Sequence, residues 1–227
     1  MINTVFFDLD GTLADTAPDL STALNQILAE QNRLPLPLET IRPTVSLGGN
    51  AMLCHAFGID EDDHSFPTLR DRFLTLYRGC LADATRLFPG MDEVIDRIEA
   101  DGLGWGVITN KSSWLTEPLM QELELDHRAG CIVSGDSTAQ RKPHPAPMLY
   151  ACQLLGCKPS HTLYVGDAQR DIEAGQRAGM HTLVAMYGYI AEEEDPAAWG
   201  ADGFVYNPLE IIEWVRNHNQ AGSNITT

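Results

Sequence analysis

Short apolar runs alternate with amphipathic stretches along most of this 227-residue chain. The first run, Thr4–Phe7, combines β-branched and aromatic residues and stops at Asp8. A continuous apolar run of this length that ends at polar residues is typical of a strand buried on both faces. Four later runs have the same character and predict further strands: Trp105–Ile108, Cys131–Val133, Thr162–Val165 and Thr182–Ala185.

Helical patterns separate these runs. Val94, Ile95 and Ile98 share one face of a helix predicted over Met91–Ala100, and Ala146–Leu155 predicts another helix. Strands that alternate with helices form βαβ units and therefore a parallel sheet. The pattern predicts an α/β fold with a Rossmann-like parallel sheet core.

Residues 16–85 interrupt this alternation, because helical spacing recurs there without a strand of the buried type. The apolar positions with this spacing are Leu20, Ala23, Leu24, Ile27, Leu28, Met52, Leu53, Ala56, Leu69, Phe73, Leu76 and Tyr77. Thr16 and Asp19 are spaced as a capping box at the start of the first helix. We predict an inserted α-helical cap domain over residues 16–85, with residues 1–15 and 86–227 forming the core.

The chain is strongly acidic, with 32 acidic against 15 basic residues and a net charge of −17. This charge repels phosphate backbones, so we expect no nucleic-acid partner. A site for a small anion would need local positive charge from a metal ion, a lysine or helix N-termini.

Location and assembly are expected to be those of an ordinary cytoplasmic protein. No apolar run approaches the roughly 20 residues that span a bilayer, and no signal peptide is evident, so we expect no membrane partner. The five cysteines form no C-x-x-C pair, which favours free thiols in a reducing compartment. We expect a monomer or a homodimer.

Chemically distinctive polar residues follow three of the predicted strands or lie between them. They are Asp8 and Asp10 after the first strand, Thr109 and Asn110 after the second, Asp167 and Asp171 after the fourth, and Lys142 in a proline-rich loop. Ligands of open parallel sheets bind at the carboxyl ends of the strands. We therefore expect these side chains to meet at one edge of the sheet.

Such a group suits phosphoryl chemistry with a metal ion. Carboxylates gathered in a partly desolvated site repel one another, and Mg²⁺, which prefers oxygen ligands, relieves this repulsion. Lysine and threonine side chains can hold phosphoryl oxygens. Asp8 can then act as a nucleophile, and Asp10 can protonate the leaving oxygen. Asp8 and Asp10 alone would be a weak signal, because such a pair is more often a solvated turn or a cation site than part of an enzyme. An EF-hand does not fit, because Gly11 follows Asp10 directly and no ligands alternate after it.

Four segments resemble the motifs of the haloacid dehalogenase-like hydrolase superfamily: Phe7–Leu13, Ile108–Lys111, Lys142-Pro143 and Val165–Asp171. They occur in the expected order, and the resemblance covers essentially the whole chain. It implies a capped, Mg²⁺-dependent phosphatase whose cap closes over the site.

The resemblance also implies a role for each matched residue. Asp8 would be the nucleophile and Asp10 the acid/base. Thr109 and Lys142 would bind the phosphate, and Asn110 would be a further substrate-binding residue. Asp8, the backbone carbonyl of Asp10 and Asp167 would hold Mg²⁺, and Asp171 would support the metal site or Lys142.

Other reactions of the superfamily fit this chain less well. At the position of Asp10, dehalogenases need no acid, the cation-pumping ATPases carry threonine, and phosphonatases carry a small residue. Phosphomutases of the β-phosphoglucomutase type share all four motifs, but they carry a histidine where this chain has Leu20. A phosphomonoester hydrolase is expected, with the mutase as an alternative.

The substrate is a small phosphate ester by this resemblance. The whole chain is similar to bacterial phosphoglycolate phosphatases. Some segments look closer to the N-acetylmuramic acid 6-phosphate phosphatases of cell-wall recycling: Ile41-Arg42, Ser46–Met52, Leu103–Lys111, Tyr187–Ile190 and Asp195–Asp202. N-acetylmuramic acid 6-phosphate is the expected substrate, and phosphoglycolate is the alternative.

Both esters carry a carboxylate, which an acidic protein must receive with a cation. Arg42 is the candidate, with Ser46 and Asn50 as polar contacts beside Gly48-Gly49; an ordinary surface role for Arg42 stays open. Two further classes are weighed against an enzyme of this kind. A metal- or phosphate-binding regulator would not need a nucleophile beside an acid, and a protein phosphatase is disfavoured by the cap.

Overall fold

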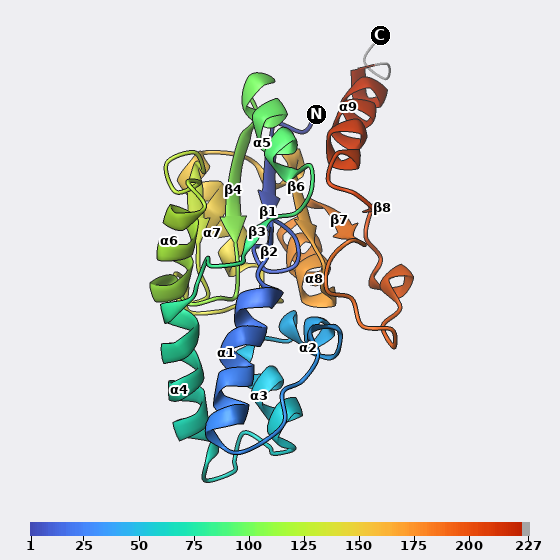
Figure 1. Ribbon diagram of the computed structural model, residues 1–227. Coiled ribbons are helices and arrows are strands. Elements are labelled where there is room, and N and C mark those ends of the chain that lie inside the picture. Colours follow the sequence, from blue (N-terminus) through green and yellow to red (C-terminus); the bar gives the residue numbers. More distant parts are fainter. Residues whose placement is uncertain (224–227) are drawn as a thin grey trace.

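The computed structural model describes residues 1–223 and is organised around a six-stranded parallel sheet (Figure 1). Its strands, in sheet order, are β5 (Cys131–Val133), β4 (Gly104–Ile108), β1 (Thr4–Phe7), β6 (Thr162–Gly166), β7 (His181–Ala185) and β8 (Gly203–Val205). The α/β class and the parallel sheet are confirmed, and all five predicted strands are present. The sequence does not signal β8, because this short edge strand leaves Phe204 39% exposed.

The central position of β1 brings the ends of three strands together. All four of its residues are buried, and it pairs in parallel with both β4 and β6. In this register Phe7 lies opposite Val107 on one side and Val165 on the other. The residues that follow these strands therefore emerge at the same edge of the sheet.

Helices cover both faces of the sheet: α5 (Met91–Ala100), α6 (Ser113–Glu122), α7 (Ala146–Leu155), α8 (Gln169–Ala178) and α9 (Glu210–Ser223). Alternate residues of a strand face opposite sides, so Val5 packs in a cluster with Val94 of α5, whereas Phe6 packs with Met148 of α7. Two 3₁₀ helices, η1 (Pro159–His161) and η2 (Pro196–Trp199), lie in connections. Within residues 1–223, no helix combines the length and the apolar character that a membrane crossing requires.

A helical segment is inserted directly after the first strand. The chain leaves the sheet through β2 (Ala14–Asp15) and returns through β3 (Arg86–Leu87), and these two strands pair with each other in antiparallel fashion. Between them lie α1 (Ala17–Glu30), α2 (Leu38–Val45), α3 (Gly49–Phe57) and α4 (Phe66–Gly79). Figure 1 shows these four helices beyond the carboxyl ends of the sheet strands. Their action as a cap remains a prediction.

The capping box predicted at the start of α1 is wrong. No side chain caps this helix, and the Thr16 hydroxyl instead donates to Asp10 Oδ1 at 2.5 Å. The buried Asp19 carboxylate accepts hydrogen bonds from the backbone of Ala84 and Thr85. Both side chains therefore bind partners outside the helix, and Asp19 fixes the segment where the chain returns to the sheet.

Candidate active site

A buried chain of charges joins the ends of β1 and β6. Lys142 Nζ lies 2.9 Å from Asp8 Oδ1 and 2.7 Å from Asp171 Oδ1, and the Lys142 side chain is fully buried. The same ammonium donates to the Ile108 carbonyl at 2.9 Å and to the Tyr164 hydroxyl at 2.8 Å. An ammonium has three N–H donors, so these four partners occupy all of them. The pairing resolves part of the repulsion between Asp8 and Asp171.

Asn110 fixes the loop that carries Lys142. Its Nδ2 donates to the Lys142 carbonyl at 3.0 Å, and its Oδ1 accepts from the Lys142 backbone N–H at 3.0 Å. The Asn110 side chain, which we predicted to bind substrate, therefore binds the backbone of Lys142. Thr109, in contrast, uses its hydroxyl only to accept from the Lys111 N–H among residues 1–223 and lines the cavity described below.

Asp167 is enclosed by short contacts from three parts of the chain. Its Oδ1 accepts from the Thr12 hydroxyl at 3.1 Å, and its Oδ2 accepts from Ser46 Oγ at 2.7 Å and from Tyr189 N–H at 2.9 Å. Gly11 has φ +84°, and a Cβ there would lie 2.1 Å from Asp167 Oδ2. Only glycine combines that backbone angle with so close an approach to the carboxylate.

Asp8, Asp167 and Asp171 form a group that suits a divalent cation, because ligand oxygens from all three lie within 4.8 Å of one another. Asp171 is ion-paired with Lys142 and also accepts from Ala168 N–H, whereas within residues 1–223 Asp167 accepts only from uncharged donors, so Asp171 is the member of the group that holds Lys142. Asp8 Oδ2 accepts no hydrogen bond from any described residue. The side chain of Asp10 lies outside this group.

Asp8 and Asp167 are costly to ionise without a cation. Burial, only partly offset by Lys142, raises the pKa of Asp8 from 3.8 to about 7, and burial raises the pKa of Asp167 to about 6. Hard oxygen ligands that resist ionisation are suited to a cation such as Mg²⁺, which favours their charged form.

These pKa values predict the pH dependence of stability in the metal-free protein. Between about pH 4 and pH 7 the folded state binds more protons than the unfolded state, so stability should fall as pH rises, by on the order of a few kcal/mol. Added Mg²⁺ should therefore raise Tm more at pH 8 than at pH 5. Thermal unfolding of wild type and Asp167→Asn checks this, since the variant should show a smaller pH dependence. An equal Mg²⁺ effect at both pH values would contradict it.

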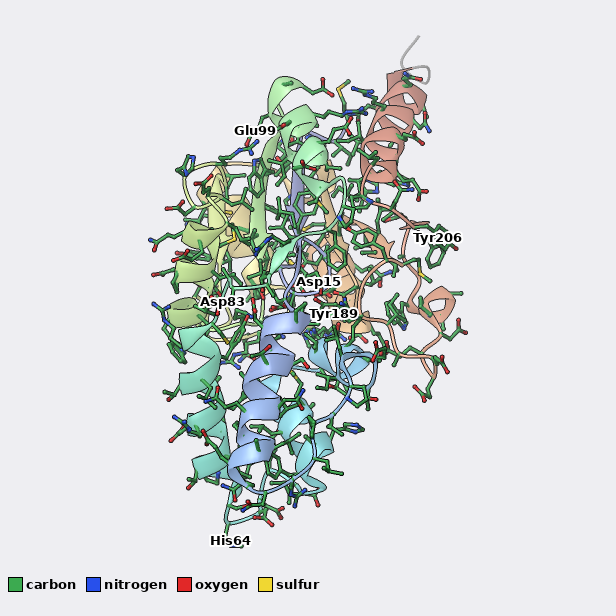
Figure 2. The ribbon with its side chains drawn as sticks, viewed as in Figure 1. Asp15, His64, Asp83, Glu99, Tyr189 and Tyr206 are labelled. Carbon is green, nitrogen blue, oxygen red and sulfur yellow. The ribbon has the colours of Figure 1, made fainter. Side chains whose placement is uncertain are left out.

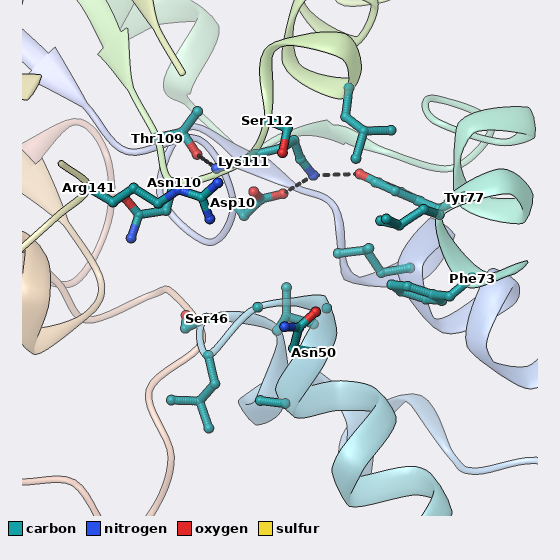
Figure 3. Close-up of a pocket in the computed structure, with 18 of the residues that line it drawn as sticks. Asp10, Ser46, Asn50, Phe73, Tyr77, Thr109, Asn110, Lys111, Ser112 and Arg141 are labelled. Atoms are coloured by element: carbon teal, nitrogen blue, oxygen red, sulfur yellow. Dashed lines mark hydrogen bonds and ion pairs between the residues drawn. The ribbon is translucent and has the colours of Figure 1, made fainter. Parts of the chain in front are cut away.

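Asp10 is held in a second chain of contacts (Figure 3). Lys111 Nζ lies 2.8 Å from Asp10 Oδ1 and 2.8 Å from the hydroxyl of Tyr77, which belongs to α4. Lys111 belongs to one of the quoted motifs, but the sequence assigns it no role. The structure makes it a link between α4 and Asp10.

A cavity of about 390 Å³ separates the sheet edge from the helical segment. Asp8, Asp10, Thr109 and Leu20 are among the residues that line it. Four cations also reach its wall: Arg70, Lys111, Arg141 and Arg170. The positive charge that an acidic protein needs for an anionic ligand is therefore concentrated here. The three arginines escape sequence prediction, because a single arginine is most often a surface residue.

Arg42, the predicted receiver of a substrate carboxylate, is not among the residues that line this cavity. Its guanidinium makes two hydrogen bonds to the Asp15 carboxylate, at 2.9 and 3.0 Å, and lies over the ring of Tyr189. Tyr189 Oη also donates to Asp15 at 2.6 Å, and Figure 2 shows these two residues together where the helical segment joins the sheet. Arg42 therefore contacts residues where the helical segment meets the sheet domain.

The other two predicted contacts from the helical segment do line the cavity. Ser46 is committed to Asp167 by its hydroxyl. Asn50 donates to Glu61 at 2.9 Å and accepts from Arg70 at 3.2 Å. The structure thus brings these residues to the cavity wall together with an arginine that the sequence did not indicate.

Comparisons with known proteins agree with this fold. The family model described as haloacid dehalogenase-like hydrolase matches residues 5–185, and the chain belongs to that family. The chain is 42% identical over 212 residues to the N-acetylmuramic acid 6-phosphate phosphatase of Pseudomonas aeruginosa, covering 93% of this chain and 94% of that enzyme. It is 38% identical over 209 residues to a phosphoglycolate phosphatase of Xanthomonas campestris, covering 92% and 94%.

Among solved structures, a predicted phosphoglycolate phosphatase from Haemophilus somnus superposes with a TM-score of 0.81. It is 27% identical, and the match covers 93% of this chain and 97% of that one. The predicted superfamily and the predicted enzyme class, a phosphatase, are confirmed by these comparisons.

Proposed function

We propose that this chain is a Mg²⁺-dependent phosphomonoesterase that works through an aspartyl-phosphate on Asp8, with N-acetylmuramic acid 6-phosphate as substrate. One observation carries the mechanism. Asp8 is a buried carboxylate whose Oδ1 is held by Lys142 and by the Leu9 N–H, while Oδ2 has no hydrogen-bond partner within residues 1–223. That oxygen belongs to a side chain on the wall of the cavity that Asp10 also lines.

The two half-reactions use Asp8 and Asp10 in turn. In the first, an Asp8 oxygen bonds to phosphorus as the bond between phosphorus and the ester oxygen breaks, and Asp10 gives a proton to the leaving oxygen. In the second, a water oxygen bonds to phosphorus, the bond to Asp8 breaks, and Asp10 takes the water proton. The Thr109 hydroxyl donates to no described residue, so it could donate to a phosphoryl oxygen.

The cation belongs to the carboxylate group at the sheet edge. Asp8 and Asp167 would hold Mg²⁺, together with the backbone carbonyl of Asp10, and Asp171 would act through Lys142. A bound Mg²⁺ would neutralise charge on the phosphoryl oxygens.

Residues 16–85 would act as a cap on the core formed by residues 1–15 and 86–227. Ser46 and Tyr77 support this division, because both extend from the helical segment to partners at the sheet edge, Asp167 and Lys111. A segment that covers the cavity in this way would exclude water during phosphoryl transfer.

The choice of substrate rests on similarity and on the cavity. The 42% identity to an N-acetylmuramic acid 6-phosphate phosphatase extends over 93% of the chain and so includes the helical segment. A cavity of about 390 Å³ is within the range of about 300–1,000 Å³ for small-molecule sites and is large for a two-carbon ester. Phosphoglycolate remains the second candidate because of the 38% identity to a phosphoglycolate phosphatase.

Arg70 replaces Arg42 as the candidate for the substrate carboxylate. Arg70→Ala should lower kcat/KM for N-acetylmuramic acid 6-phosphate about tenfold, since a hydrogen bond to a charged group contributes about 1.5–3 kcal/mol. N-acetylglucosamine 6-phosphate, which lacks the carboxylate, should show little change. Arg72→Ala, on the same helix but paired with Glu30, is the matched control. An equal loss with both esters would remove Arg70 from carboxylate recognition.

The proposed activity is tested by steady-state hydrolysis of a panel of phosphorylated metabolites with and without Mg²⁺. N-acetylmuramic acid 6-phosphate should give the highest kcat/KM, and phosphoglycolate should be compared directly. Isomerisation of β-glucose 1-phosphate in place of hydrolysis would favour a phosphomutase. Leu20 lines the cavity at the position where mutases of this type carry a histidine, which supports hydrolysis.

A further inference from the structure

Arg170 differs from the other cations of the cavity in having no hydrogen-bond or ion-pair partner among the described residues. It is the second residue of α8, between Asp167 and Asp171, and it lines the cavity together with Asp8 and Thr109. Its Nε is buried without a hydrogen bond, and within residues 1–223 its guanidinium makes no hydrogen bond or ion pair. Arg170 is half-buried, and a partly desolvated guanidinium whose Nε has no acceptor is costly unless a ligand supplies one.

The contacts of Lys142 make this free guanidinium more significant. All three N–H donors of Lys142 are already used by four protein groups. Lys142 can therefore reach a phosphoryl oxygen only by giving up one of these partners. Within residues 1–223 Arg170 has no partner to give up, and it lines the same cavity as Asp8.

We propose that Arg170 is a further catalytic residue, whose guanidinium binds the oxygens of the phosphoryl group while that group moves to and from Asp8. This inference rests on the phosphoryl transfer of the proposed function, but it does not depend on which ester is the substrate. The planar fork of arginine matches the oxygens of a phosphoryl group, and it stabilises charge that increases in the transition state. The bonds that form and break are those of the two half-reactions above.

The alternative role for Arg170 is to balance the charge of Asp8, Asp167 and Asp171 without touching substrate. The two roles predict different results when lysine replaces Arg170. A lysine supplies the same charge without the fork, so it would restore a charge-balancing function fully but a bidentate contact only in part.

The experiment compares wild type with Arg170→Gln, Arg170→Lys and the control Arg216→Gln, which alters an exposed arginine of α9 paired with Asp101. Removing one such donor should lower kcat/KM about 100-fold in Arg170→Gln, with partial recovery in Arg170→Lys and no change in the control. The second readout needs no turnover. Inorganic phosphate, added with Mg²⁺, should raise the Tm of wild type, and its Kd from this shift should weaken about tenfold in Arg170→Gln.

Two results would overturn the inference: a phosphate Kd in Arg170→Gln within twofold of wild type, or full wild-type values in Arg170→Lys. If Arg170→Gln fails to fold, Arg170→Lys still decides, because the proposal requires it to lose part of its phosphate affinity. If wild type hydrolyses no ester of the panel, the proposed function fails, yet the Tm shift with inorganic phosphate still tests Arg170.

Discussion

Asp8→Asn should lower kcat for every ester by at least about 10⁴-fold, because the amide cannot form the bond to phosphorus that the carboxylate forms. The fold should survive this change. Burial raises the pKa of Asp8 to about 7, so its charged form is already costly, and Lys142 keeps Asp171 as an ion-pair partner. Steady-state assays with Mg²⁺, together with unfolding curves, measure both properties.

The control for this substitution is Asp62→Asn, because Asp62 is exposed in the connection between α3 and α4. It should leave kcat unchanged. Acid-quenched wild type should carry a phosphoryl group that Asp8→Asn lacks, as mass spectrometry can show. Robust hydrolysis by Asp8→Asn would end the covalent mechanism and leave only a metal-assisted attack by water.

Lys142→Met should both abolish turnover and destabilise the protein by about 3–5 kcal/mol, because it leaves buried carboxylates without their cation. Lys142 is 0% exposed at its side chain, as is Asp171, so water cannot take the place of the lost ammonium. Protonation of a carboxylate would relieve part of this cost. The loss of stability should therefore be smaller at pH 5.5 than at pH 8.

Urea unfolding at these two pH values measures the effect, with Lys158→Met as the control because Lys158 is exposed. That variant should stay within about 0.5 kcal/mol of wild type at both pH values. A loss of less than about 1 kcal/mol in Lys142→Met at pH 8 would mean that the buried pair contributes far less than its burial implies.

The sequence predicts best those features that depend on local patterns. Strand β1 and the helices α5 and α7 have the predicted bounds, because buried runs and helical faces are visible in the residues themselves. The two-residue strands β2 and β3 are too short to give a period, and α2 contains Pro43, which weakens its helical signal. These elements depend on the packing of the insertion and not on their own residues.

The candidate site divides in the same way. Asp8, Asp167 and Lys142 meet because parallel strands bring their carboxyl ends to one edge, which topology alone implies. Strand topology does not predict the partners of Arg42 and Asn110. Asp15 and the Lys142 backbone come close to them only when the tertiary structure has formed. Side-chain pairing across elements is set by packing, and no period in the sequence records it.

The hydrogen bond from Ser46 to Asp167 and the contact of Tyr77 with Lys111 have a consequence for recombining such enzymes. Each of these hydrogen bonds joins a residue of the helical segment to a residue at the sheet edge. A chimera that exchanges residues 16–85 for the corresponding segment of a relative would therefore exchange parts of the chemical apparatus as well as the substrate-facing surface. We expect such a chimera to gain the relative's specificity and stay active only when the relative carries a serine and a tyrosine at the positions of Ser46 and Tyr77.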